Sequence, residues 1–314
     1  MKILHISDLH YKESAETADM LEVAQQQLKA LHPDLILITG DLTHDGLDEQ
    51  FRTVKQFIAS LAFCTVLVIP GNRDIAKTTV SVPLERSDLE YFLLTHPEPT
   101  LDTIDSLGPL NKTQMERQGK YLDYFPTTEI FYRAKGIAVV GLNSTPEVSP
   151  RSMDMAVQHF RKGQPGELRI FCAHHSFLPV PTKKLRAGDV VPHSADILQT
   201  LIEYNVDLLC CGHIHRSHVW DLSGGIHRLL CCNAGSLFDM SGKKDNGFLD
   251  IEIERDLRIV KRTLSSRRTV PLYSRAHFSD MLRERQGERQ RHFDGESTNE
   301  VNTTRSKMKK AKKR

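Results

Sequence analysis

Residues 2–10 read KILHISDLH and residues 34–41 read DLILITGD, and each stretch joins an apolar run to a short polar loop. Short runs of Ile, Leu and Val bounded by Gly, Asp or Pro are typical of strands buried on both faces of a sheet. The same pattern returns at four further places: 65–69, 137–142, 168–173 and 206–211. We therefore expect a central sheet of short, buried strands.

Helical patterns lie between these runs. Apolar residues recur at helical spacing in 15–31 and 193–204, and a third pattern covers 47–60. Because strand and helix alternate, the sequence predicts an α/β fold with a largely parallel centre. After residue 218, strand-like runs joined by short turns predict antiparallel additions at 228–233, 247–253 and 258–264.

Two segments differ from this alternation. Residues 76–135 separate consecutive strands by far more than a usual connection, and their helix-like stretches at 84–94 and 112–124 predict a helical insert that could act as a lid. Residues 280–314 are polar and rich in Arg, Gln, Glu and Lys, which predicts a disordered tail. The expected main domain therefore covers 1–279, with the insert at about 76–135.

The composition excludes several classes of protein. The 314 residues are 39% hydrophobic and 26% charged, which is typical of a globular chain. No apolar run approaches the roughly 18 residues of a membrane span, so a transmembrane protein is not expected. The six cysteines lie mostly in apolar runs and predict buried thiols rather than disulfides. The first residues lack the apolar stretch of a secretory signal, so we expect a cytoplasmic protein.

The small net charge of +2 hides an asymmetry. Residues 301–314 carry seven Lys or Arg and no acid, which leaves about 35 basic against 40 acidic residues in the rest of the chain. A solvated tail is one interpretation of this segment. Binding to nucleic acid or anionic lipid is the alternative, because clustered lysines neutralise phosphates without sequence preference.

Polar side chains follow five of the predicted strands at the points where the strands end. In open α/β sheets, ligands bind at the carboxyl ends of the strands, so these loops are expected to meet. Their carboxylates, amide and imidazoles form an oxygen and nitrogen set suited to Mn²⁺, Fe or Zn²⁺. The candidate metal ligands are Asp8, His10, Asp41, Asn72, His174, His213 and His215.

The spacing of these residues sharpens the prediction. In Asp8-x-His10 and His213-x-His215 the partners are two apart, so on extended backbone they would project to the same side. Each motif alone is often structural, but chance does not readily explain the ordered set. Seven ligands suit two ions that share a bridging carboxylate. Such a pair clamps a phosphate and activates water, which implies attack of metal-bound hydroxide on phosphorus.

The ordered series resembles the calcineurin-like binuclear metallophosphoesterases over roughly residues 1–265. The LHISDLH, GDLTHDG and AHHSFLP stretches are most similar to the class III cyclic-nucleotide phosphodiesterase branch. The resemblance implies a sandwich of two β-sheets flanked by helices. It also implies that one ion is held by Asp8, His10 and His215, the other by Asn72, His174 and His213, and that Asp41 bridges them. His174 rather than its neighbour His175 corresponds to the ligand of the family.

One position departs from the family pattern, which usually has His where this chain has Arg73. We predict catalytic roles for Asn72, Arg73 and Asp74, with the alternative that Arg73 simply pairs with Asp74. Arginine cannot donate its proton near neutrality, but it can hold a phosphate oxygen. A poor alkoxide leaving group needs a proton, whereas a phosphate leaving group does not. The same Gly-Asn-Arg-Asp occurs in UDP-diacylglucosamine hydrolases, which cleave a pyrophosphate.

We therefore expect a metallophosphoesterase, a hydrolase that acts on a phosphodiester or phosphoanhydride of a nucleotide-like small molecule. A cyclic-nucleotide phosphodiesterase is one alternative, and a nucleic-acid-associated phosphoesterase or nuclease tethered by the basic tail is another. The native metal pair and the oligomeric state stay open. Ser236 fits either a plain turn or a place near the site. Four further histidines are expected to be ordinary polar or core residues: His5, His44, His193 and His218.

Overall fold

The computed structural model of the chain describes most of the main domain. The described residues are 1–75, 81–82, 110–111, 120–134, 136–145, 147–164, 166–181, 184–185, 188–224, 227–238 and 246–282.

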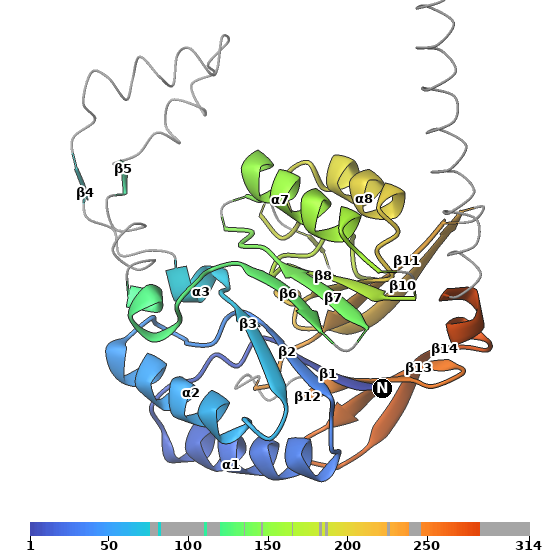
Figure 1. Cartoon of the computed structure of the whole chain (residues 1–314). Helices are drawn as coiled ribbons and strands as arrows, with labels where there is room; N and C mark the ends of the chain where they lie inside the picture. The colour runs from blue at the N-terminus through green and yellow to red at the C-terminus, as the bar shows by residue number, and fades with distance from the viewer. Residues whose placement is uncertain are drawn as a thin grey trace, which may run out of the picture.

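Two six-stranded sheets stack face to face, as the resemblance implies (Figure 1). The first sheet has the order β14-β13-β12-β1-β2-β3. Its strands are β1 (Lys2–Ile6), β2 (Leu35–Thr39), β3 (Thr65–Ile69), β12 (Gly247–Ile253), β13 (Leu257–Thr263) and β14 (Thr269–Arg275). The second sheet has the order β10-β11-β9-β8-β7-β6. Its strands are β6 (Ile130–Ala134), β7 (Ile137–Gly141), β8 (Leu168–Cys172), β9 (Leu208–Cys211), β10 (Ser217–Gly224) and β11 (His227–Ala234).

The centre of each sheet is parallel, as predicted. Strands β1, β2 and β3 pair in parallel, and so do β7, β8, β9 and β11. The prediction of antiparallel additions is correct for β12, which runs antiparallel to β1, and for β13. It is wrong for the inner edge of β11, which pairs in parallel with β9 and is antiparallel to β10. β10 is the edge strand of this sheet. After the β10–β11 turn the chain reverses, so β11 lies between β10 and β9 and runs parallel to β9.

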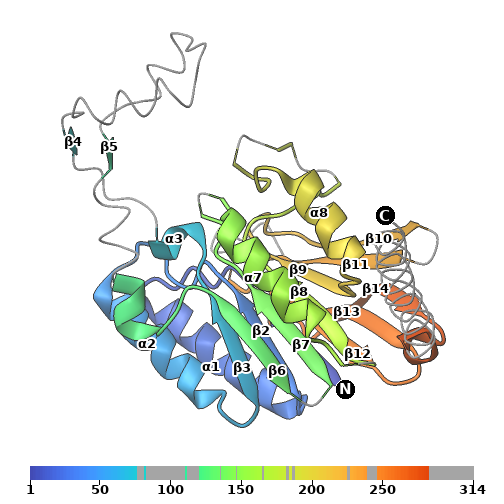
Figure 2. The same ribbon diagram turned by 45° about the horizontal axis from the view of Figure 1, so that its top comes forward.

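Helices cover the outer face of each sheet. On the first sheet lie α1 (Ala15–Ala30) and α2 (Asp48–Ser60). On the second lie α7 (Pro150–Arg161), which contacts β7, and α8 (Ser194–Glu203), which contacts β11; Figure 2 shows both helices over this sheet. The single turn α3 (Asn72–Ile75) follows β3 directly. The helix α7 is not among the helices predicted from the sequence. None of the helices in the described ranges is long and apolar enough to cross a membrane.

Along the central strands, alternate side chains point to opposite faces and pack in two separate apolar layers. Ile3 and Leu35 face the other sheet, whereas Leu4 and Ile36 pack under α1 and α2. A third layer lies between the second sheet and its helices, around Phe171 and Phe160. Because both faces of each central strand are covered, these strands read as continuous apolar runs in the sequence.

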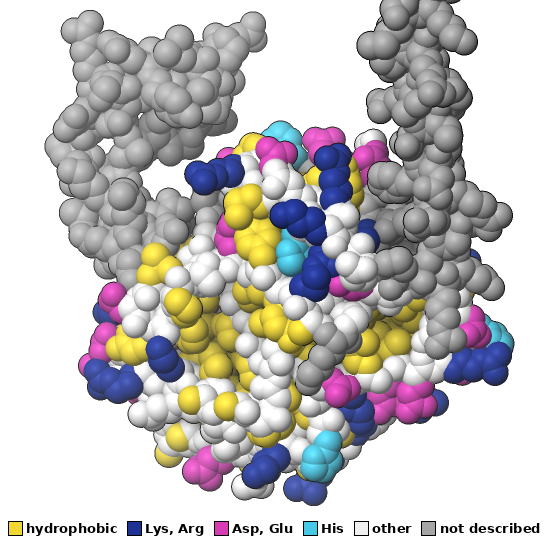
Figure 3. Space-filling model, viewed as in Figure 1, with side chains coloured by type: hydrophobic (Ala, Val, Ile, Leu, Met, Phe, Trp, Pro, Cys, Tyr) yellow, Lys and Arg dark blue, Asp and Glu magenta, His cyan; other side chains and the backbone are white. Residues whose placement is uncertain are grey.

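The outer edges of the two sheets meet on one side of the molecule. Strands β3 and β6 are the last strands of their sheets, they contact each other, and most of their residues are half-buried. Figure 3, in the same view as Figure 1, shows apolar side chains gathered over this region.

The predicted insert and tail lie largely outside the described residues. Within 76–135, the structure describes a short antiparallel pair, β4 (Ser81–Val82) and β5 (Leu110–Asn111), a helical stretch at 120–124, and β6. The last part of the expected helical insert is thus a strand of the second sheet. At the other end, residues 278–282 are helical, so 280–282 are ordered, and the remainder of the expected tail lies beyond the described ranges.

Candidate metal centre

Five loops meet where the carboxyl ends of the parallel strands of the two sheets lie together. The loops after β1, β2 and β3 come from the first sheet, and those after β8 and β9 come from the second. They bring the seven candidate ligands into two adjoining groups. The first group is Asp8, His10, Asp41 and His215, and the second is Asp41, Asn72, His174 and His213.

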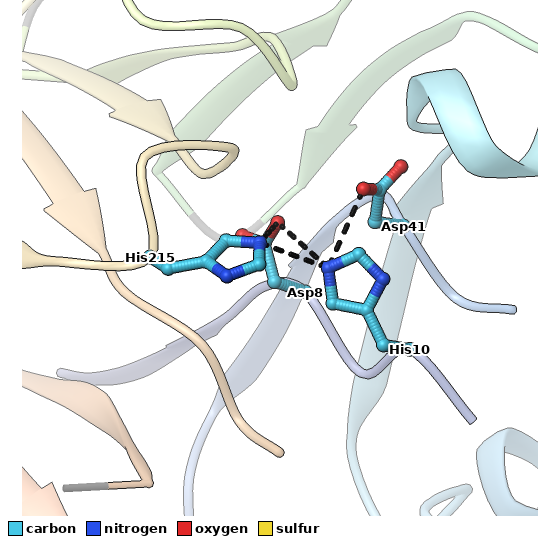
Figure 4. Close-up of side chains that lie close together, drawn as sticks. All are labelled: Asp8, His10, Asp41 and His215. Atoms are coloured by element: carbon cyan, nitrogen blue, oxygen red, sulfur yellow. Dashed lines mark hydrogen bonds and ion pairs between the residues drawn. The ribbon is translucent and has the colours of Figure 1, made fainter. Parts of the chain in front are cut away.

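The first group is compact and mostly buried. The Nε2 atoms of His10 and His215 are 2.9 Å apart, and His215 Nε2 is 3.1 Å from Asp8 Oδ1. His10 Nε2 also lies 3.6 Å from Asp8 Oδ1 and 3.5 Å from Asp41 Oδ2. Figure 4 shows the two rings turned toward each other and toward Asp8, with Asp41 reaching the same nitrogen of His10.

The second group converges on the amide oxygen of Asn72. That oxygen lies 3.1 Å from His174 Nε2 and 3.1 Å from His213 Nδ1, and these two nitrogens are 3.3 Å apart. The other carboxylate oxygen of Asp41, Oδ1, is 3.4 Å from His174 Nε2. Asp41 therefore presents one oxygen to each group.

The donor atoms fit a cation at each group. Asp8 Oδ1 is buried and accepts no hydrogen bond among the described residues. His174 Nδ1 lies 2.7 Å from the Thr39 carbonyl oxygen, which can only accept, so the ring proton sits on Nδ1 and a lone pair on Nε2. Bonds of about 2.1 Å at octahedral or tetrahedral angles place ligand atoms roughly 3.0–3.4 Å apart, close to the separations within both groups.

Burial and neighbouring charges shift the pKa values of Asp8, Asp41 and His10 in the first group. Burial alone would raise the pKa of Asp8, but the adjacent imidazoles of His10 and His215 hold it well below its ordinary value. The pKa of Asp41 is raised, because the carboxylate is buried and lies near Asp8. Burial opposes the charged form of His10, yet the two carboxylates raise its pKa.

The backbone of the pairs Asp8-x-His10 and His213-x-His215 is not extended, as the sequence predicted, but left-handed. Asp8 (φ 54°), His10 (φ 45°), His213 (φ 65°) and His215 (φ 56°) are all left-handed, as is Asp41 (φ 50°). This conformation is uncommon for residues other than glycine and costs of order 1–3 kcal/mol where it is strained. The sharp turns, rather than strand alternation, aim both members of each pair at the centre.

Two glycines permit the loops to approach each other. A Cβ atom at Gly71 would collide with the backbone nitrogen and the carboxylate of Asp41, and one at Gly212 would collide with the Ser7 hydroxyl and the Asp8 carboxylate. A side chain at either position would push apart loops that carry candidate ligands.

The two remaining predicted catalytic residues have different surroundings. Arg73 is exposed; its backbone N–H donates to Asp41 Oδ1 at 2.8 Å, and its guanidinium reaches the His44 carbonyl oxygen at 3.5 Å. Asp74 is fully buried and, among the described contacts, accepts hydrogen bonds from Gly71, Leu42 and Thr43 rather than from Arg73. Burial and the charge of Asp41 raise the pKa of Asp74 to about 6, against these hydrogen bonds.

His175 stands behind the second group. Its Nδ1 pairs with the Ser144 hydroxyl at 2.9 Å, and its ring packs on His213 with 4.5 Å between centroids. The His5 side chain is buried beneath the site and pairs with Thr39, whereas the His44 ring lies 6.1 Å from that of His10. Neither His5 nor His44 belongs to the two described groups.

Two supporting residues come from the end of β11 and from the segment that follows it. The Ser236 hydroxyl donates to the Asp8 carbonyl oxygen at 2.9 Å, and Asn233 donates to the Gly212 carbonyl oxygen at 3.0 Å. The sequence left Ser236 open and gave no signal for Asn233, because their partners are more than twenty residues away along the chain.

Comparisons with curated proteins find relatives with named activities. The chain is 30% identical over 90 residues to a probable cyclic nucleotide phosphodiesterase of Vesicomyosocius okutanii, covering 29% of this chain and 38% of that protein. A probable cyclic nucleotide phosphodiesterase of Coxiella burnetii is 22% identical over 226 residues, or 69% of this chain and 77% of that one. The glycerophosphodiester phosphodiesterase GpdQ of Enterobacter lignolyticus is 30% identical over 87 residues, covering 24% of this chain and 30% of that protein. The two shorter alignments thus span less than half of the relatives' length.

Solved structures share the fold at low sequence identity. A purple acid phosphatase from yellow lupin superposes with a TM-score of 0.59 at 12% identity, over 90% of this chain and 55% of that one. A dimetal phosphatase from Danio rerio superposes with a TM-score of 0.53 at 13% identity, over 87% of this chain and 99% of that one.

The model of the calcineurin-like phosphoesterase family matches residues 1–217 of this chain. These residues contain all seven candidate ligands. Membership implies a binuclear metal site, and both groups lie where the matched strands end. The chain therefore belongs to the calcineurin-like phosphoesterase family.

Proposed function

We propose that this protein is a metal-dependent phosphoesterase that hydrolyses a phosphodiester or phosphoanhydride bond in a nucleotide-like small molecule. The observation that carries the proposal is the position of Asp41, with Oδ2 facing His10 and Oδ1 facing His174 at 3.5 and 3.4 Å. A single carboxylate shared between two donor groups is what a binuclear site needs.

In this proposal, Asp8, His10 and His215 would hold one ion, Asn72, His174 and His213 would hold the other, and Asp41 would be shared between them. The oxygen and nitrogen donors suit Mn²⁺, Fe or Zn²⁺. Such a pair, when bound, acts as a Lewis acid toward phosphoryl oxygens and makes water more acidic. The chain's own contribution is to hold six side chains and the shared carboxylate in place before substrate arrives.

Arg73 supports a leaving group that needs no proton. Its backbone N–H fixes Asp41, and its exposed guanidinium is free of any described carboxylate, so it can bind a phosphoryl oxygen in the open part of the site. It cannot serve as a general acid, because a guanidinium keeps its proton near neutral pH. Departure of a phosphate, whose second pKa is about 6, is therefore favoured over departure of a sugar alkoxide.

Cyclic-nucleotide hydrolysis is the second candidate. The observation that favours it is that the relatives from Vesicomyosocius okutanii and Coxiella burnetii are named probable cyclic nucleotide phosphodiesterases. Hydrolysis of a 3′,5′-cyclic phosphate expels an alkoxide, so this activity would require a proton source other than Arg73.

A turnover panel with the full chain loaded with Mn²⁺ tests both candidates. The panel contains cyclic nucleotides, UDP-sugars, dinucleoside polyphosphates, mononucleotides and aryl phosphates. We expect the highest kcat/KM for a phosphoanhydride, and a fall of roughly 10²–10³-fold for Asp41→Asn, as when one preorganised electrostatic group is lost.

The outcomes separate the proposals. If cyclic nucleotides are turned over fastest, the second candidate replaces the first. Near wild-type turnover in Asp41→Asn would contradict the shared carboxylate and with it the binuclear site. An exposed acid on α1 provides the matched control, because Asp19→Asn leaves the site untouched.

A further inference from the structure

A carboxylate outside the family motifs faces the second group. Asp189 Oδ1 lies 3.4 Å from Nε2 of His213, and the Asp189 residue is only 9% exposed. Nothing in the local sequence around residue 189 marks it as part of the site.

The two ring nitrogens of His213 point to different surroundings. Nδ1 faces the Asn72 oxygen and His174 Nε2, so it is the atom available to the second ion. A neutral imidazole carries one proton, and a lone pair on Nδ1 requires that proton to sit on Nε2. Nε2 in turn faces a carboxylate, which is an acceptor.

His174 has the opposite arrangement. Its Nε2 faces the group, and its Nδ1 donates to the Thr39 carbonyl oxygen at 2.7 Å. Both histidines of the second group thus have an oxygen acceptor behind the nitrogen that does not face the centre. For His213 this acceptor is charged, which increases the basicity of the ring toward a metal ion.

Asp189 is fixed to the same loop that carries His174. Ser176 and Val190 form a short parallel bridge, and the Val191 N–H donates to the Ser176 carbonyl oxygen at 2.9 Å. The ring of His175 packs against the face of His213. The Asp189 carboxylate and the tilted ring of His175 therefore lie against His213 on two different sides.

We infer that Asp189 is a positioning residue that fixes the tautomer and orientation of His213 and thereby sets the affinity of the second metal ion. The inference rests on the proposed function, because it concerns the binuclear site. It adds a residue that supports the second ion and leaves the first ion unaffected.

Binding of Co²⁺ and Mn²⁺ to the full chain tests the inference without using activity. Co²⁺ is followed by its visible absorption and Mn²⁺ by calorimetry, each starting from metal-free protein. Wild type is expected to bind two ions. In Asp189→Asn the binding of one ion should weaken by about 10–100-fold, the usual effect of losing such a partner, while the other stays unchanged.

A neighbouring acid supplies the control. Asp196 lies on α8, its side chain is 84% exposed, and its ion pair is with His193. Asp196→Asn should bind both ions with wild-type affinity. Melting of the metal-free variants shows whether each one folds.

Two results would overturn the inference: Asp189→Asn binding both ions as wild type does, or losing both to the same extent. Should the variant fail to fold, long-range ¹H–¹⁵N spectra of the metal-free wild type decide instead, since a proton on Nδ1 of His213 contradicts the inference and a proton on Nε2 supports it. If wild type itself binds fewer than two ions, the binuclear proposal fails, which is a different result from an unaffected Asp189→Asn.

Discussion

At the scale of single residues, Asp74 holds two loops of the site together. Its buried carboxylate accepts hydrogen bonds from the backbone of Gly71 at 2.8 Å, Leu42 at 3.0 Å and Thr43 at 2.9 Å, and from the Thr43 hydroxyl. These donors belong to the loops after β2 and β3, which carry Asp41 and Asn72. Asp74 therefore acts on the site through the backbone rather than through Arg73.

Removing this carboxylate should destabilise the protein. In Asp74→Ala several buried donors lose their partner, each at about 1–3 kcal/mol, with part of the loss offset by entering water. We expect the free energy of unfolding in urea, measured without metal, to fall by about 3–5 kcal/mol. Asp19→Ala, on an exposed face of α1, should stay within about 0.5 kcal/mol of wild type. A change below about 1 kcal/mol for Asp74→Ala would show that the two loops do not depend on it.

At the scale of elements, the helices that cover the sheets begin in different ways. α7 has Ser149 at its N-cap, whose hydroxyl accepts from the Ser152 N–H, and Pro150 follows it in the first turn. α2 begins after Leu47, whose backbone is extended (φ −81°, ψ 152°) but whose side chain makes no capping hydrogen bond. α7 therefore has a side-chain N-cap hydrogen bond, whereas α2 has none.

This contrast predicts stability changes of opposite sign. Ser149→Ala should lower the free energy of unfolding by about 1 kcal/mol, because a first-turn N–H loses its acceptor. Leu47→Ser should raise it by about 0.5–1 kcal/mol, since a hydroxyl is added where the backbone already has the N-cap conformation and Leu47 is 45% exposed. Chemical denaturation of the two variants measures both, and shifts in the same direction would contradict the argument.

At the scale of the whole molecule, the candidate centre joins the two sheets. Asp8, Asp41 and Asn72 follow strands of the first sheet, whereas His174 and His213 follow strands of the second. The sheets also share an apolar layer that contains Ile3 and Ile170. Two bound metal ions would therefore add cross-links at one end of an existing interface between the sheets.

Metal binding should therefore stabilise the folded chain as a unit. Ligand that binds only the folded state at about a hundred times its Kd adds about 2.7 kcal/mol to the free energy of unfolding. Addition of Mn²⁺ should raise Tm in calorimetry, EDTA should reverse the change, and Asp41→Asn should show a much smaller rise. An unchanged wild-type Tm at saturating Mn²⁺ would count against ions that link the sheets.

The sequence by itself determined the short buried strands, the parallel centres and the order of the polar loops. These are local properties: an apolar run covered on both faces, a helix at 3.6-residue spacing, and a polar residue where a strand ends. The predicted elements do not include β6, β10, β14 or α7. β6 lies at the end of the predicted insert, and its residues are half-buried throughout, so it lacks the continuous apolar run of a central strand.

Only the tertiary structure decided how the loops are shaped and what stands behind them. The left-handed backbone at Asp41 and Asp8 occurs where other loops approach closely, at Gly71 and Gly212 respectively, and no local pattern encodes that approach. The parallel pairing of β11 with β9, the loop contacts of Asp74 and the carboxylate of Asp189 beside His213 likewise join residues distant along the chain. Such contacts arise from packing of the two sheets, and a single sequence records only the ends of each one.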